Sequence, residues 1–258
     1  MKQFFAILIA ALLLLAVGCA QKPSIDGPDP DAKSVTEGTT GEQGDIELPE
    51  IGGDMPVVGG WKIIGEGRAQ LPEEAEQAFR TVTEKLLGAT YVPVAYLGSQ
   101  IVAGMNYAIL CTRTLVTANP VTDLAVITVY VDLEGNAELL NIADFDLGAY
   151  AQAEDAGAPE LLDGGWQAPE SAEAMDAMPQ EAATAYAKAL EGFVGNNLTP
   201  VALLGTQLVA GTNYAFLCHS SLVTLEPVVS MQVVVIYADL SGNATITNIV
   251  TVNPADFN

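Results

Sequence analysis

The chain carries two kinds of apolar spacing, one typical of helices and one typical of strands, and each occurs twice. The first helical segment runs from Pro72 to Gly88, because proline suits a first helical turn and glycine suits a helix end. Its apolar residues recur every three or four positions and define one face: Ala75, Phe79, Val82 and Leu86. The second segment runs from Pro179 to Gly195 and has an equivalent face: Ala182, Tyr186, Leu190 and Phe193.

Each helical segment is followed by four stretches rich in Val, Ile, Thr and Tyr, which is typical of β-strands. After the first helix these stretches cover roughly residues 91–100, 105–117, 125–133 and 137–145. One helix ahead of consecutive strands predicts the α+β class, with an antiparallel sheet that packs one face onto the helix.

The two blocks of helix and strands are copies of each other. When the sequence is shifted by 107 residues, from Gln100 to Gln207, more than half of the positions between Pro93 and Ile142 meet an identical residue. Both copies also open on Gly-Gly-Trp. A period of this length fits a complete small domain and is far too long for a solenoid repeat. We therefore expect two small domains of one kind.

Composition narrows the classes of function. The 258 residues include 32 acids against 9 Lys and Arg, for a formal charge of −23, and 50% of them are apolar. The apolar content argues against global disorder, and the acidic balance argues against nucleic acid and against adhesion to an anionic bilayer. One histidine and three cysteines leave little material for His-based catalysis or a zinc site. We expect no enzyme activity, no cofactor and no metal.

The N-terminal residues predict export and a lipid anchor. The apolar run before Cys19 is too short to span a bilayer comfortably and has the length of a signal-peptide core. The segment Leu15–Cys19 resembles the lipobox of bacterial lipoproteins, and an ordinary signal peptide is the alternative. The resemblance implies a signal peptide over residues 1–19, lipidation at Cys19 and a place on the extracellular face of a bacterial membrane. Residues 20–58 then read as a flexible acidic linker.

A short motif lies between the first two predicted strands of each copy. It reads Gln-Ile-Val-Ala-Gly at 100–104 and Gln-Leu-Val-Ala-Gly at 207–211. These residues resemble the QxVxG loop of the cystatin family of cysteine-protease inhibitors, and 207–214 is similar to the same stretch of the stefin branch. The family also has a glycine near the start of the domain and a second hairpin downstream. Gly-Gly-Trp and Gly-Asn stand at those places in both copies.

The resemblance implies two tandem cystatin-like domains, residues 59–148 and 164–258, joined by a linker over 149–163. Each would be an antiparallel sheet of four to five strands wrapped on one helix. It also implies a cell-surface inhibitor that blocks the active-site cleft of papain-like cysteine proteases with an N-terminal glycine segment and two hairpin loops. The alternative is a non-inhibitory protein-binding or adhesion module on the same scaffold.

The resemblance assigns protease binding to matching residues of both copies. In the first copy these are Gly59, Gly60, Gln100, Ile101, Val102, Ala103, Gly104, Gly135 and Asn136. In the second they are Gly164, Gly165, Gln207, Leu208, Val209, Ala210, Gly211, Gly242 and Asn243. No charged residue occurs from Ala95 to Cys111 or from Thr199 to Cys218, so no charge at either first hairpin would have to be desolvated on binding.

Two cysteines and the single histidine are the remaining candidates for chemistry. Cys111 and Cys218 occupy equivalent strand positions, and we expect buried thiols that act as small apolar side chains; a disulfide between the domains is the alternative. Cys218 and His219 are adjacent on a predicted strand, so their side chains should point to opposite faces. The sequence therefore predicts no catalytic pair here.

Overall fold

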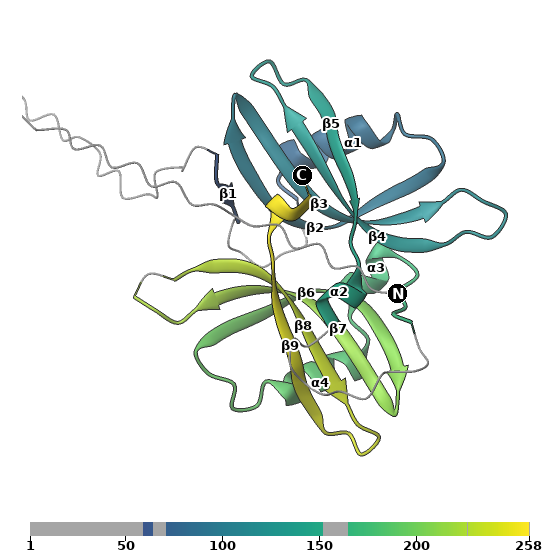
Figure 1. The fold of residues 1–258 in the computed structure, drawn as a ribbon, viewed down its shortest axis with the longest axis vertical. Coiled ribbons are helices and arrows are strands. Elements are labelled where there is room, and N and C mark those ends of the chain that lie inside the picture. Colours follow the sequence, from purple (N-terminus) through teal and green to yellow (C-terminus); the bar gives the residue numbers. More distant parts are fainter. Residues whose placement is uncertain (1–58, 64–70, 152–164, 226, 258) are drawn as a thin grey trace, which may run out of the picture. The chain divides into compact units, whose positions relative to one another are not determined.

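A computed structural model describes residues 59–63, 71–151, 165–225 and 227–257, which all belong to one compact unit, Gly53–Asn258 (Figure 1). The predicted signal peptide, Cys19, the linker over 20–58, most of the linker over 149–163 and Gly164 lie outside the described residues. No helix in the described ranges is long and apolar enough to cross a membrane.

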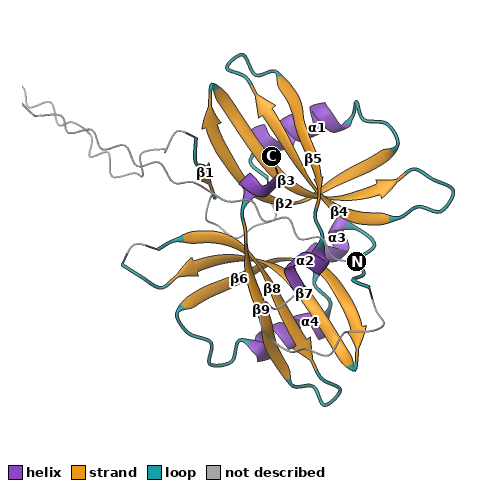
Figure 2. Cartoon of the chain, in the orientation of Figure 1, coloured by secondary structure: helices purple, strands orange, loops and turns teal. Residues whose placement is uncertain are grey.

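The first copy forms a fully antiparallel sheet in the order β1-β2-β3-β4-β5. Its strands are β1 (Trp61–Lys62), β2 (Ala89–Val102), β3 (Gly104–Leu115), β4 (Thr122–Val131) and β5 (Ala137–Asp144). Helix α1 (Glu73–Thr83) lies between β1 and β2 in the chain and covers one face of the sheet (Figure 2). The short helix α2 (Leu147–Ala151) follows β5, starts in the predicted first domain and ends in the segment over 149–163 that was predicted as a linker.

The second copy forms an antiparallel sheet in the order β6-β7-β8-β9. Its strands are β6 (Asn196–Val209), β7 (Gly211–Leu222), β8 (Val229–Ala238) and β9 (Ala244–Val252). They are accompanied by α3 (Ala172–Ala177), α4 (Gln180–Ala189) and the 3₁₀ turn η1 (Pro254–Phe257). A bridge between Gln167 and Thr206 stands where Lys62 pairs with Ser99 in the first copy.

The two longer helices start where the sequence predicts and end earlier. Pro72 and Pro179 directly precede α1 and α4, and three glutamates occupy the first turn of α1. The helices end at Thr83 and Ala189, not near Gly88 and Gly195, so the predicted helices are too long. Gly88 has a φ of 89° and its carbonyl accepts the amide of Val116, which makes residues 84–88 a turn into β2.

The predicted α+β class is wrong, because strands dominate the described chain. The α-helices have 11, 5, 6 and 10 residues, whereas β2 and β6 alone have 14 residues each. The predicted strand from 91 to 100 extends to Val102, and its partner begins directly after Ala103. The long hairpins make the fold predominantly antiparallel β.

The prediction that each sheet packs one face onto its helix describes half of the packing. In β3, Tyr107, Ile109 and Cys111 face α1, whereas Ala108 and Leu110 point to the opposite side. That opposite side is also buried, because these residues belong to a core cluster that includes Ala215 and Leu217 of the second sheet.

The shared core, as we call this cluster, draws residues from both copies. It contains Val94, Leu97, Leu110 and Val126 from the first copy and Val201, Leu204, Leu217 and Val233 from the second. Trp61 and Trp166 pack against its rim. Each sheet is therefore buried on both faces, by a helix on one side and by the shared core on the other.

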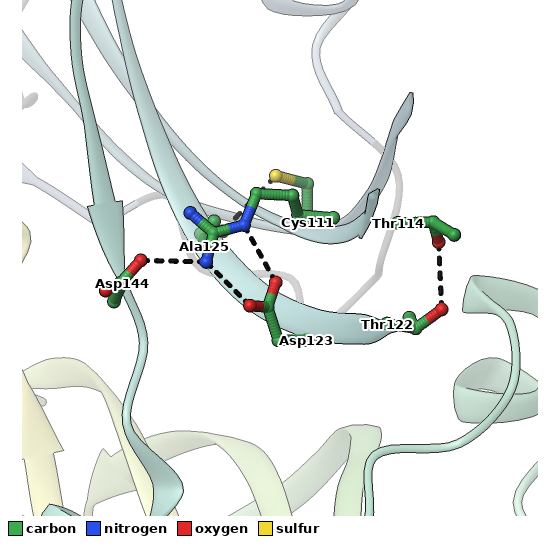
Figure 3. Close-up of polar contacts among 7 residues, drawn as sticks. Cys111, Thr114, Thr122, Asp123, Ala125 and Asp144 are labelled. Atoms are coloured by element: carbon green, nitrogen blue, oxygen red, sulfur yellow. Dashed lines mark hydrogen bonds and ion pairs between the residues drawn. The ribbon is translucent and has the colours of Figure 1, made fainter. Parts of the chain in front are cut away.

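Hydrogen bonds and ion pairs between side chains join the strands of the first sheet at the end away from the QxVxG hairpin. Arg113 of β3 donates to both carboxylate oxygens of Asp123, at 2.9 and 2.6 Å, and lies 2.9 Å from a carboxylate oxygen of Asp144 (Figure 3). The Thr114 and Thr122 hydroxyls are 2.9 Å apart beside this group. Strands β3, β4 and β5 are thus held together by charge-assisted hydrogen bonds.

Candidate functional site

One end of the first sheet brings together the N-terminal glycine segment and the QxVxG hairpin. The amide of Gly59 donates to the carbonyl of Ile101 at 3.1 Å, and the side-chain Nε2 of Gln100 donates to the carbonyl of Gly59 at 2.8 Å. The Gln100 Oε1 atom in turn accepts the Nδ2 of Asn106 at 2.8 Å. Gln100 therefore ties β1, β2 and β3 together at this end.

The tip of this hairpin is a tight connection around Ala103. Val102 is paired with Gly104, so a single residue, Ala103, joins β2 to β3. Gly104 has a φ of 130°, and a Cβ there would overlap the carbonyl oxygen of Val131 and lie 2.8 Å from the Tyr130 ring. The sheet itself requires this glycine, because only glycine adopts that φ readily and leaves room for β4.

The hairpin tip is also bonded to the strand that leads into the second hairpin. The hydroxyl of Tyr130 donates to the carbonyl of Ala103 at 2.5 Å. Two residues later, Asp132 accepts the amides of Glu134 and Asn136, at 3.0 and 2.7 Å, and the Asn136 Nδ2 at 2.8 Å. These hydrogen bonds hold the pKa of Asp132 below its ordinary value and shape the β4–β5 turn.

Three predicted segments of the first copy therefore meet at one end of the sheet. Gly59 lies beside Ile101, and the β2–β3 tip lies beside the β4–β5 turn. The apolar side chains at this end are partly or fully open to solvent: Val102 is 38% exposed and Leu133 is 81% exposed. We call this group of segments the first hairpin end.

The second copy builds the two hairpins of this arrangement in the same way, and we call them the second hairpin end. Gln207 Oε1 accepts the Nδ2 of Asn213 at 2.9 Å, and the hydroxyl of Tyr237 donates to the carbonyl of Ala210 at 2.6 Å. Asp239 accepts the amides of Ser241 and Asn243 in the following turn.

Its apolar side chains are open to solvent as well. Leu208 is 74% exposed and Leu240 is 88% exposed.

The glycines of the second copy match those of the first. Gly211 has a φ of 135°, and a Cβ there would overlap the carbonyl oxygen of Ala238. Gly165 is exposed, as Gly60 is in the first copy.

The second hairpin end also borders an open pocket of about 480 Å³ beside α4. Its lining includes Thr184 and Ala185 of α4, Thr212 and Tyr214 of β7, and Ala238 and Leu240 near the second turn. Thr212 and Ala238 replace the larger Met105 and Val131 of the first copy. The two ends share one backbone design and differ in the side chains beside it.

Two pairs of residues that shape the ends were missed by the sequence reasoning. Tyr130 and Tyr237 anchor the tips, and Asp132 and Asp239 hold the turns. Each pair is identical between the copies although the strands around it differ, and that identity is the signal that could have found them.

The thiols lie inside the two helix-side cores. Cys111 and Cys218 are both free and buried, and burial raises the pKa of each thiol to about 12. Cys218 packs with Tyr186 of α4, whose hydroxyl lies 3.6 Å from the sulfur. A thiol held neutral in this way is a packing group and not a nucleophile.

His219 and the acidic side chains are the other groups that could carry chemistry. Burial lowers the pKa of His219, the neighbour of Cys218 in β7. Within residues 59–63, 71–151, 165–225 and 227–257, no group of three or more His, Cys, Asp or Glu side chains is placed to hold a metal ion. The hairpin ends present exposed apolar side chains on a hydrogen-bonded frame.

No protein-family model matches the chain, and no curated protein matches it either.

Proposed function

We propose that the protein inhibits papain-like cysteine proteases by inserting a hairpin end into the active-site cleft. The observation that carries the proposal is the meeting of Gly59, the Gln100–Gly104 tip and the β4–β5 turn at one end of the first sheet. The sequence likeness of these segments to the binding segments of cystatins supports the same conclusion.

The first hairpin end has the physical properties that such a wedge needs. Tyr130 donates to the carbonyl of Ala103 at the tip, and Gln100 donates to the carbonyl of Gly59, so both segments are fixed before any partner arrives, which limits the entropy lost on binding. It carries no charge from Ala95 to Cys111, and it presents Val102 and Leu133 to solvent. Burial of those side chains in a groove contributes about 25 cal/mol per Å² of apolar surface removed from water, before the entropy lost on association is subtracted.

The hairpin ends are free of the packing that joins the two copies. The shared core is built from strand residues such as Leu97, Leu110 and Leu204, and the tip residues Ala103 and Ala210 are exposed. A partner can therefore reach these tips without separating the sheets.

The proposal also places the protein outside the cell. The lipobox-like segment ending at Cys19 supports attachment to the outer face of a bacterial membrane. Replacement of Cys19 by Ser should then release the protein from the membrane fraction, and unchanged membrane association would contradict the lipid anchor.

The test is a titration of papain with the wild-type chain and with the double variant Ala103→Asp/Ala210→Asp. We expect the wild type to inhibit and the double variant to bind at least about 100-fold more weakly, since a new carboxylate would be buried unpaired at each contact. Both positions are exposed in the free protein, so the fold should be unaffected.

The matched control adds the same charges at the opposite end of each sheet. Val116 and Val223 are equivalent residues, 70% and 66% exposed, in the turns after β3 and β7. Val116→Asp/Val223→Asp should inhibit as the wild type does. No inhibition by the folded wild type at micromolar concentration would refute the proposal, as would equal loss in both double variants.

A further inference from the structure

The contacts between the two copies come in reciprocal pairs. Asn141 of β5 donates its Nδ2 to the carbonyl of Phe257, at 2.9 Å. Asn248 of β9 donates its Nδ2 to the carbonyl of Tyr150, at 2.8 Å. A shift of 107 residues carries Asn141 onto Asn248 and Tyr150 onto Phe257, so each copy gives the other the same hydrogen bond.

A second reciprocal pair lies at the bends of the two longest strands. A Cβ at Gly98 of β2 would lie 3.5 Å from Pro254 Cγ, and a Cβ at Gly205 of β6 would lie 2.8 Å from Leu147 Cδ1. Gly98 and Gly205 are equivalent positions, as are Leu147 and Pro254. Each copy therefore places the segment after its last strand against the same glycine of the other copy.

Reciprocity of this kind is the property of an isologous, two-fold interface, in which residue i meets j and the equivalent of j meets the equivalent of i. Here the two halves belong to one chain, and the shared core fills the space between them. The phenyl ring of Phe145 stacks on that of Phe257 from the other copy, with centroids 5.8 Å apart. The tandem copies thus form an internal pseudo-dimer.

A two-fold arrangement places equivalent features on opposite sides of the axis. In Figure 1 the β4–β5 turn of the first hairpin end lies at the top, and the β8–β9 turn of the second lies at the bottom. Leu133 and Leu240, in those turns, are 81% and 88% exposed. A protein seated on one hairpin end therefore leaves the other uncovered.

We propose that one chain binds two protein partners at the same time, one at each hairpin end. This inference rests on the proposed function, since the partners are papain-like proteases. The internal pseudo-dimer makes the protein bivalent, and the shared core keeps the distance between the two bound enzymes fixed.

The experiment titrates active-site-counted papain with the full chain and measures the mass of the saturated complex by light scattering. We expect activity to vanish at half a chain per papain molecule, and the complex with excess papain to have the mass of one chain plus two enzymes. The single variants Ala103→Asp and Ala210→Asp should each need one whole chain per papain and form a complex with one enzyme.

The outcomes separate this inference from the proposed function. A wild-type complex that saturates with one papain molecule would overturn bivalency and leave inhibition standing. The same follows if one single variant behaves as the wild type while the other loses all binding, because a single end would then do the work. Absence of any complex with the folded wild type would overturn both proposals.

Discussion

Truncation of Leu204 in the shared core should destabilise both copies together. Leu204 belongs to the second copy and is 0% exposed, in a cluster with Leu97 and Leu110 of the first copy. Replacement by alanine removes buried methyl groups and leaves a cavity that the rigid sheets close only in part, at a loss of about 3 kcal/mol. With an unfolding slope of about 3 kcal/mol per molar urea, the midpoint should fall by about 1 M.

The two tryptophans allow each copy to be followed separately. Trp61 and Trp166 lie in different copies and both pack against the shared core. Urea unfolding is measured by fluorescence in the single-tryptophan backgrounds Trp166→Phe and Trp61→Phe, with and without Leu204→Ala. Both reporters should show one transition, displaced by the same amount.

The matched control truncates an exposed leucine of the same copy. Leu240→Ala removes the same number of atoms from a side chain that is 88% exposed, and the midpoint should stay within the error of the measurement. If Leu204→Ala moves only the Trp166 transition, the copies unfold independently and the shared core does not couple them.

Three further predictions concern single residues. His219 is the single histidine, and its imidazole NMR signal should titrate below pH 6.5 because burial lowers its pKa. Below pH 6.5 the unfolded chain then binds more protons than the folded chain, so the free energy of unfolding falls as the pH decreases toward the folded pKa. A pKa above 6.5 would contradict the packing of β7. Cys111 and Cys218 should react with a disulfide reagent far more slowly in the folded chain than after denaturation, because both thiols are buried and burial raises their pKa; equal rates would show that the thiols are open. Gly211→Ala should lower the melting temperature because its methyl would overlap the carbonyl of Ala238, whereas an unchanged melting temperature would show that the tip can shift.

The hairpins were the part of the fold that the sequence could predict. The glycines and asparagines of the turns, and the spacing of apolar residues after Pro72 and Pro179, have local causes that a sequence displays directly. The positions where the helices end depend on distant contacts instead. Gly88 ends a turn because its carbonyl meets Val116, nearly thirty residues away in the sequence, and no local pattern shows that.

The prediction that each sheet packs only onto its helix was incomplete, because it assigned each sheet one buried face. The runs Tyr107–Cys111 and Ala125–Val129 are almost continuously apolar, which is typical of strands buried on both sides. That signal was present in the sequence. The partner of the second face was not, because reciprocal contacts such as Asn141 to Phe257 join residues that only the folded chain brings together.

The candidate site also has a part that the sequence could predict and a part that only the folded chain shows. The motif from Gln100 to Gly104 and its copy were visible as a repeat, whereas the anchoring of Ala103 by Tyr130 required the register of β3 against β4. The boundaries of the two predicted domains stay a prediction, and the shared core now shows that the copies pack as one unit.

Hydrogen exchange of the chain with and without papain is the sharpest test of binding through the two hairpin ends. We expect slower exchange on binding at the two hairpin ends, residues 100–104, 132–136, 207–211 and 239–243. Exchange at the opposite turns, around Val116 and Val223, should not change. Protection of those opposite turns, or unchanged exchange at both hairpin ends in a chain that binds papain, would contradict binding through the hairpin ends.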